Sequence, residues 1–65
     1  MLSEQQIDRM KTRVDEMLLA MLGSELLVQR WWHSQNWHFN LEKPYVVWDY
    51  DPESVYSYVA GNAFK

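Results

Sequence analysis

Apolar residues in the first third of the chain recur at helical spacing. They stand three, four, three, one, three and one positions apart and form a single stripe: Ile7, Met10, Val14, Met17, Leu18, Met21 and Leu22. Ser3 precedes this stripe as a natural N-cap, and Gln6 completes a capping box with it. Gly23 follows the stripe, and glycine is the residue best suited to the left-handed conformation that closes a helix. The pattern predicts a first helix that runs to about Leu22.

A second helix is predicted immediately after this glycine. Ser24 can cap it, and Glu25 is favourably placed near its positive end. Two i,i+4 pairs give the segment two apolar ridges: Leu27 with Trp31, and Val28 with Trp32. The helix should end near His33 or Ser34. We therefore expect a tight corner at Gly23-Ser24, either an αα-hairpin or an L-shaped turn.

The next segment, residues 35–43, has no periodicity. It predicts a loop pinned by three apolar side chains, Trp37, Phe39 and Leu41. Pro44 suits the first turn of a helix, and residues 45–48 would complete a short one. The β-branched pair at positions 46 and 47 leaves a strand as the alternative, although both flanks indicate helix termini.

The last helix is predicted from its start signal. Asp51 serves as N-cap, Pro52 takes the first helical position and Glu53 lies in the first turn. Three apolar residues would then face one way: Val55, Tyr58 and Val59. Gly61 would end the helix and leave residues 62–65 as a short tail. The chain is thus predicted to be an all-α single domain, residues 1–65, of about four helices: a long first helix, a corner and two short C-terminal helices.

Composition and charge exclude several classes of function. The chain has 65 residues and no cysteine, so disulfides and thiolate metal sites are excluded. No stretch has the roughly 20 apolar residues of a membrane span, and no basic region precedes an apolar run. We therefore expect a cytoplasmic protein that does not enter a membrane. The net charge is −3 and no basic stripe is visible, so the aromatic run WWHSQNWHF at residues 31–39 does not predict a nucleic-acid stacking platform.

Residue types that could support catalysis or metal binding are present without the necessary spacing. His33 and His38 are five positions apart, which matches neither a helical zinc pair nor a zinc finger. Four carboxylates cluster in sequence: Glu42, Asp49, Asp51 and Glu53. Positions at a helix start account for Asp51 and Glu53, and a turn accounts for Asp49. Both glycines are expected at helix ends, which leaves no glycine-rich phosphate loop. We expect no enzyme activity, no catalytic residue, no cofactor and no metal.

The methionines and aromatic residues indicate a possible interface. Met10, Met17 and Met21 lie on the stripe of the first helix, where they can fill the core or form a pliable binding surface. The chain also has four Trp and four Tyr, residue types often found as interface anchors. A domain of this size has difficulty burying all of them in one core.

The order of these features resembles the toxin-binding domain of the Xre/MbcA/ParS-type antitoxins. The resemblance covers about residues 18–61 and rests on the following sequence: Leu22-Gly23-Ser24-Glu25, Trp31, Asn36, Leu41, Pro44, Trp48, Asp51-Pro52-Glu53-Ser54-Val55, Tyr58-Val59 and Gly61. That family has a helix corner, a helix ending in Trp-Leu, a loop carrying Asn and an apolar residue, a Pro-led short helix and a final helix closing at Gly. The family's N-terminal helix-turn-helix domain is not carried over, because residues 1–17 are too short for one.

The candidate site residues divide into structural and partner-binding residues. Physical reasoning assigns the structural ones: Gly23 and Ser24 form the corner, Trp31 plugs it as the innermost ring, and Pro44, Asp51 and Pro52 start helices. Trp32 and Trp37 exceed what the fold needs and are expected on a partner surface. The resemblance implies that the protein dimerises and blocks a RES-domain toxin that consumes NAD⁺. It also implies that a C-terminal segment reaches the toxin's active site; here that segment is Gly61, Asn62, Ala63, Phe64 and Lys65.

Two readings of function therefore remain open. The first is an interaction domain that binds and inhibits a partner enzyme as an antitoxin. The second is a structural or assembly module, of phage or host origin, that self-associates through its Met and Trp surface and inhibits nothing.

Overall fold

The computed structural model describes residues 2–63, which form four α-helices and one short 3₁₀ helix. Their bounds are α1 Glu4–Leu22, α2 Glu25–His33, η1 Trp37–Phe39, α3 Pro44–Tyr50 and α4 Pro52–Ala63. The described residues contain no strand, and their only β pairing is an isolated bridge between Asn36 and Glu42. The predicted all-α architecture with a long first helix is confirmed. The alternative of a strand at residues 46–47 is wrong, because both residues lie in α3.

The predicted capping signals form as hydrogen bonds at both ends of α1. The Ser3 hydroxyl accepts from the Gln6 amide at 3.2 Å, and the Gln6 side chain accepts from the Ser3 amide at 2.9 Å. Gly23 adopts a left-handed conformation with φ of 84°, and its amide donates to the Leu19 carbonyl at 2.8 Å. The helix therefore ends where its sequence signal predicts.

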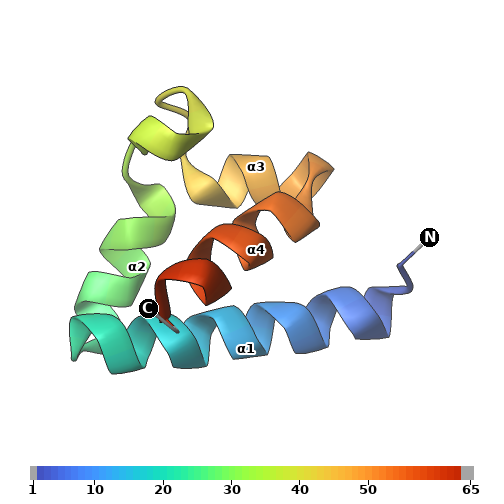
Figure 1. The fold of residues 1–65 in the computed structure, drawn as a ribbon, viewed down its shortest axis with the longest axis horizontal. Helices are drawn as coiled ribbons and strands as arrows, with labels where there is room; N and C mark the ends of the chain where they lie inside the picture. The colour runs from blue at the N-terminus through green and yellow to red at the C-terminus, as the bar shows by residue number, and fades with distance from the viewer. Residues whose placement is uncertain (1, 64–65) are drawn as a thin grey trace.

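α2 begins one residue after this glycine. The Ser24 hydroxyl accepts from the Leu27 amide at 3.1 Å and caps the new helix. Figure 1 shows α2 turning away from the end of α1 instead of running back along it. The corner at Gly23-Ser24 is therefore L-shaped, which decides between the two predicted geometries.

The core lies where the four helices meet, with α4 lying between α1 and α3 in Figure 1. Each α-helix contributes two buried hydrophobic residues and η1 contributes one: Val14, Leu18, Val28, Trp32, Phe39, Val47, Trp48, Val55 and Val59. The predicted inward face of α4 is confirmed, because Val55 and Val59 are buried and Tyr58 packs against the core. The predicted starts of the last two helices are also confirmed: Pro44 opens α3, and the Asp51 carboxylate accepts from the Ser54 amide at 3.3 Å ahead of Pro52.

The prediction that Trp31 is the innermost ring of the corner is wrong. Trp32 takes that position and is only 3% exposed, whereas Trp31 is half-buried at the edge of the core. The two residues are on different ridges of α2, and the ridge of Val28 and Trp32 is the one that faces α1 and α3. The two ridges have the same spacing along the chain, so the sequence does not show which one is buried. Tertiary packing determines this.

The prediction that Gly61 ends the last helix is also wrong. α4 continues through Gly61 and Asn62 to Ala63, and the Asn62 side chain donates to the Tyr58 carbonyl at 2.8 Å. Glycine is only weakly unfavourable inside a helix, at roughly 1 kcal/mol relative to alanine, so it does not compel a stop. Phe64 and Lys65, also predicted to belong to a tail, lie outside the described residues.

Candidate functional site

Residues 36–42, hereafter the Trp37 loop, form a closed turn between α2 and α3. Five backbone hydrogen bonds hold it. Amides donate to carbonyls in these pairs: Asn36 to Glu42 at 3.1 Å, Phe39 to Asn36 at 3.1 Å, Asn40 to Trp37 at 3.3 Å, Leu41 to Asn36 at 2.9 Å and Glu42 to Phe39 at 3.0 Å. The Asn36 side chain also accepts from the His38 amide at 2.9 Å. The chain turns back through left-handed conformations at Asn40 and Leu41, with φ of 56° and 68°. A leucine in this region is uncommon and costs on the order of 1 kcal/mol.

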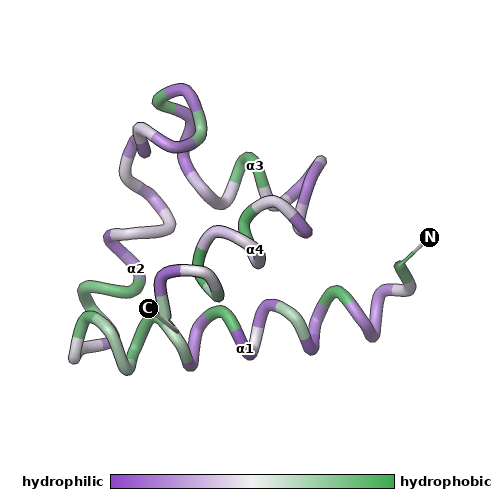
Figure 2. The backbone as a smooth tube through the Cα atoms, viewed as in Figure 1, coloured by the Kyte–Doolittle hydropathy of each residue, from purple (hydrophilic) through white to green (hydrophobic). Residues whose placement is uncertain are grey.

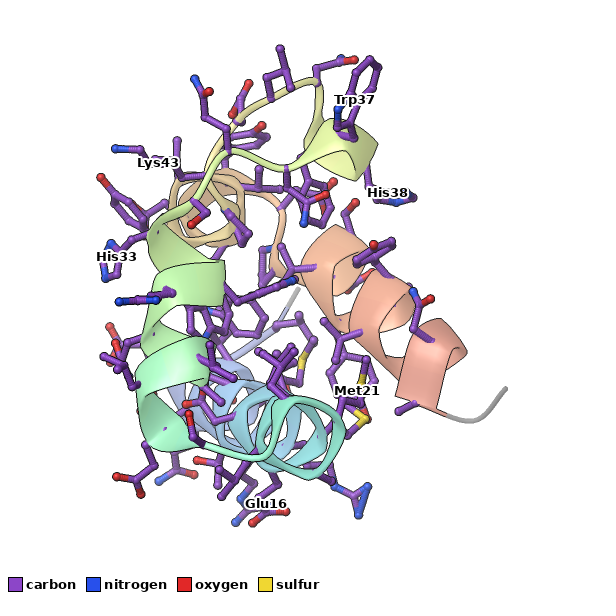
Figure 3. All side chains as sticks on the ribbon, turned by 90° about the vertical axis from the view of Figure 1, so that its left-hand side faces the viewer. Glu16, Met21, His33, Trp37, His38 and Lys43 are labelled. Atoms are coloured by element: carbon purple, nitrogen blue, oxygen red, sulfur yellow. The ribbon has the colours of Figure 1, made fainter. Side chains whose placement is uncertain are left out.

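This turn points one aromatic ring inward and another outward. Phe39 is buried in the core, whereas the Trp37 side chain is 88% exposed and Leu41 is half-exposed. Figure 3 shows Trp37 projecting from the end of the molecule formed by this loop. Of the three residues predicted to pin the loop, only Phe39 does so. The prediction that Trp37 is available to a partner agrees with its exposure.

Aromatic contacts fix the Trp37 loop against α4. The His38 ring stacks on Tyr58 at 4.1 Å between centroids, and Phe39 meets the same tyrosine edge-on at 5.5 Å. His33 contacts a different ring, that of Tyr45, at 4.8 Å. The two histidines thus serve separate packing contacts. Within residues 2–63, no group of three or more His, Asp or Glu side chains is arranged to hold a metal ion.

A side-chain hydrogen bond ties the end of the loop to α3. The Tyr50 hydroxyl donates to the Glu42 carboxylate at 2.7 Å. This bond raises the pKa of the Tyr50 phenol above its ordinary value, with further contributions from desolvation and from the negative charges of Glu42 and Asp51. Glu42 and Asp51 therefore have structural partners in the fold.

Trp32 is unavailable to a partner, contrary to its predicted role on a binding surface. Its indole NH donates to the Asp15 carboxylate at 2.7 Å, and its ring meets Trp31 and Trp48 edge-on at 5.2 and 5.7 Å. Lys11 lies 5.0 Å from the centroid of the Trp32 ring and forms a salt bridge of 3.1 Å with Asp15. Since these contacts leave almost none of the ring exposed, Trp32 acts in the core.

The sequence did not predict a second exposed apolar surface, a groove between α1 and α2 beside their corner. This corner groove has a volume of about 530 Å³, and its lining includes Asp15, Glu16 and Leu19 from α1 and Glu25, Leu26 and Gln29 from α2. Leu26 is 64% exposed and Leu19 is 41% exposed. In Figure 2, hydrophobic positions lie on both sides of the corner, at the end of α1 and near the start of α2. Both leucines fall outside the apolar stripes of their helices. That position was the one sign in the sequence that their side chains would be exposed.

The methionines divide between the core and the surface. Met10 and Met17 pack against the buried core, whereas Met21 is exposed near the corner. Figure 3 shows Met21 on the opposite side of α1 from Glu16. Core packing therefore describes Met10 and Met17, whereas Met21 has the exposure that an interface residue needs.

The C-terminal residues predicted to enter a partner are helical as far as they are described. Gly61, Asn62 and Ala63 form the last turn of α4, so they do not make a separate tail. Among residues 2–63, no helix combines the length and apolar character needed to cross a lipid bilayer. Comparison with protein-family models, with curated proteins and with solved structures finds no match to this chain.

Proposed function

We propose that this chain is a protein–protein interaction domain that binds a partner protein through the Trp37 loop. The observation that carries the proposal is the exposure of Trp37, 88%, on a loop that five backbone hydrogen bonds close. Tryptophan combines a large apolar face with a hydrogen-bond donor and is enriched among residues that dominate binding energy. Because the loop is already ordered, binding would require little loss of backbone entropy.

The partner that we propose is an enzyme, which this chain inhibits in the cytoplasm as an antitoxin. Support for this finer proposal is the ordered set of residues that resembles the antitoxin domains, from the Gly23-Ser24 corner to the helix start at Asp51-Pro52. The same resemblance implies a RES-type, NAD⁺-consuming toxin as the target and a homodimer as the inhibitor. In this proposal the chain itself is not an enzyme, and it acts by occluding the active site of its partner.

Affinity capture with matched variants tests the binding proposal. Tagged wild-type protein and the Trp37→Ala and Trp37→Phe variants would be purified from the native cells and their bound proteins identified by mass spectrometry. The proposal expects an enzyme in stoichiometric amount with wild type, less with Trp37→Phe and little with Trp37→Ala. Val46→Ala is the control, because it removes an exposed apolar side chain from α3, outside both the Trp37 loop and the corner groove. Equal recovery of the enzyme by wild type and Trp37→Ala would refute the role of the loop.

Inhibition requires a separate test at the C-terminus. Removing only residues 64 and 65 leaves α4 and the Asn62–Tyr58 hydrogen bond in place, so the truncated chain should fold. If the terminus occludes the active site, the truncated chain should still bind the captured enzyme and should inhibit its NAD⁺ consumption less. Full inhibition by the truncated chain would exclude occlusion by these two residues.

The alternative is a structural or assembly module that self-associates without inhibiting an enzyme. The exposure of several large apolar side chains near the corner favours it: Leu19, Met21, Leu26 and Leu27. Sedimentation over a range of protein concentrations distinguishes the two functions. A concentration-dependent mass with no captured enzyme would support the module.

A further inference from the structure

The corner groove is an exposed apolar surface with a fixed shape. Leu19 and Leu26 project into it from different helices, and its volume of about 530 Å³ is within the usual range for binding sites. The Gly23 amide and the Ser24 hydroxyl hold the corner by the hydrogen bonds that end α1 and begin α2. The walls of the groove are therefore ordered before any ligand binds, which lowers the entropic cost of binding.

The charges of the groove select the chemistry of its occupant. The charged residues of the lining are all acidic, namely Asp15, Glu16 and Glu25. Asp15 already has partners in Lys11 and the Trp32 indole, whereas Glu16 and Glu25 form no salt bridge with any residue in the range 2–63. Two carboxylates without a salt bridge in the described residues thus flank Leu19 and Leu26, although Glu16 also lines a neighbouring hollow with Arg9 and Arg13. A cationic ligand would gain from both, and an anionic ligand would be repelled.

We propose that the corner groove binds a basic, amphipathic segment of a partner protein. One large apolar side chain of that segment packs between Leu19 and Leu26, and flanking Lys or Arg residues pair with Glu16 and Glu25. A second copy of this chain is a poorer occupant, because each copy carries a net charge of −3. This site does not depend on the Trp37 loop: Figure 3 shows Trp37 and Glu16 at opposite ends of the molecule.

A synthetic peptide serves as the probe. It has about 12 residues with one Leu between Lys and Arg residues at helical spacing, and a charge-reversed peptide carries Glu in place of each Lys and Arg. Fluorescence anisotropy would measure the affinity of each peptide, at about 50 mM and at about 300 mM NaCl. The proposal expects the basic peptide to bind at least roughly tenfold more tightly than the reversed one, and to weaken at the higher salt concentration.

Amide chemical shifts in a ¹⁵N-labelled sample locate the binding site. The basic peptide should shift the amides of Thr12, Leu19, Leu26 and Gln29 and leave the indole NH of Trp37 unchanged. The Leu26→Ser variant should lower the affinity for the basic peptide by roughly fivefold or more. The double variant Glu16→Gln with Glu25→Gln should lower it by a similar factor. Glu53→Gln is the matched control, because it removes an exposed carboxylate at the start of α4, outside the groove.

The outcomes separate this proposal from the proposed function of the Trp37 loop. Unchanged peptide affinity in Trp37→Ala together with lost affinity in Leu26→Ser supports the groove, whether or not an enzyme is captured. Equal affinity for the basic and reversed peptides would overturn the proposal, as would shifts confined to the Trp37 loop. A stable dimer whose interface covers Leu19 and Leu26 would overturn it as well, because a second copy would then be the occupant.

Discussion

Trp32 and Trp37 carry the same side chain in opposite environments, and local backbone geometry accounts for both. Trp32 lies one helical turn after Val28, on the face of α2 that packs into the core, where Asp15 satisfies its indole NH. Trp37 opens a 3₁₀ turn that buries Phe39, so the ring two positions earlier points to solvent. One indole therefore stabilises the fold, whereas the other is free to bind.

Substituting the two tryptophans should separate stability from binding. Trp32→Ala removes a buried ring and leaves Asp15 without its indole partner, so the free energy of unfolding should fall by about 3–5 kcal/mol. Trp37→Ala should change it by less than about 0.5 kcal/mol, because the ring is in solvent. Urea unfolding followed by circular dichroism measures both values. Comparable losses in the two variants would contradict this assignment.

The hydrogen bond between Tyr50 and Glu42 should be visible in a pH titration. Glu42→Gln removes the negative acceptor, so the pKa of Tyr50 should move down towards its ordinary value of 10.0. The raised pKa means that the fold favours the neutral phenol. This contribution to stability is present below the ordinary pKa and is lost as the pH rises through the folded-state pKa. Ultraviolet absorbance of tyrosinate gives the titration, with Tyr50→Phe as the control that identifies the signal. An unchanged Tyr50 titration in Glu42→Gln would show that the charge of Glu42 does not raise this pKa.

At the scale of the helices, the same substitution at the two glycines should have opposite effects. Gly23 has φ of 84° and Gly61 lies inside α4, and an added Cβ would meet no atom within 4 Å at either position. Backbone conformation alone therefore decides whether alanine raises or lowers the stability at each position. Gly23→Ala should destabilise the protein by about 1 kcal/mol, and Gly61→Ala should stabilise it by about 0.5–1 kcal/mol. Thermal unfolding checks both, and a loss of stability in Gly61→Ala would mean that α4 ends before this residue.

Helix starts could be predicted from the sequence because each depends on a few adjacent residues. Ser3, Ser24 and Asp51 all cap as predicted, through bonds to amides three positions later. The end of α4 could not be predicted in this way. A glycine closes a helix only when its φ is positive, and the presence of a glycine in the sequence does not determine its φ. The corner groove was out of reach for another reason. It exists only through the placement of α2 on α1, and no residue pattern within either helix encodes that angle.

At the scale of the molecule, the two exposed apolar surfaces are separate. The Trp37 loop and the corner groove lie at opposite ends, with the core between them (Figure 3). The groove carries the free carboxylates, whereas the loop presents Trp37 and Leu41 without a cluster of charge. One partner could therefore contact both surfaces only with two separate segments, and two partners could bind together.

Separate surfaces predict independent contributions to binding. For a captured partner that contacts both, Trp37→Ala and Leu26→Ser should each weaken binding, and their losses in binding free energy should add within about 0.5 kcal/mol in the double variant. Neither substitution removes a core residue, so the double variant should keep the stability of the wild type. Titration calorimetry of the four proteins against the partner measures the cycle. A double variant no weaker than Trp37→Ala alone would show that the groove takes no part in this complex, whereas strong coupling would mean that the two ends communicate through the core.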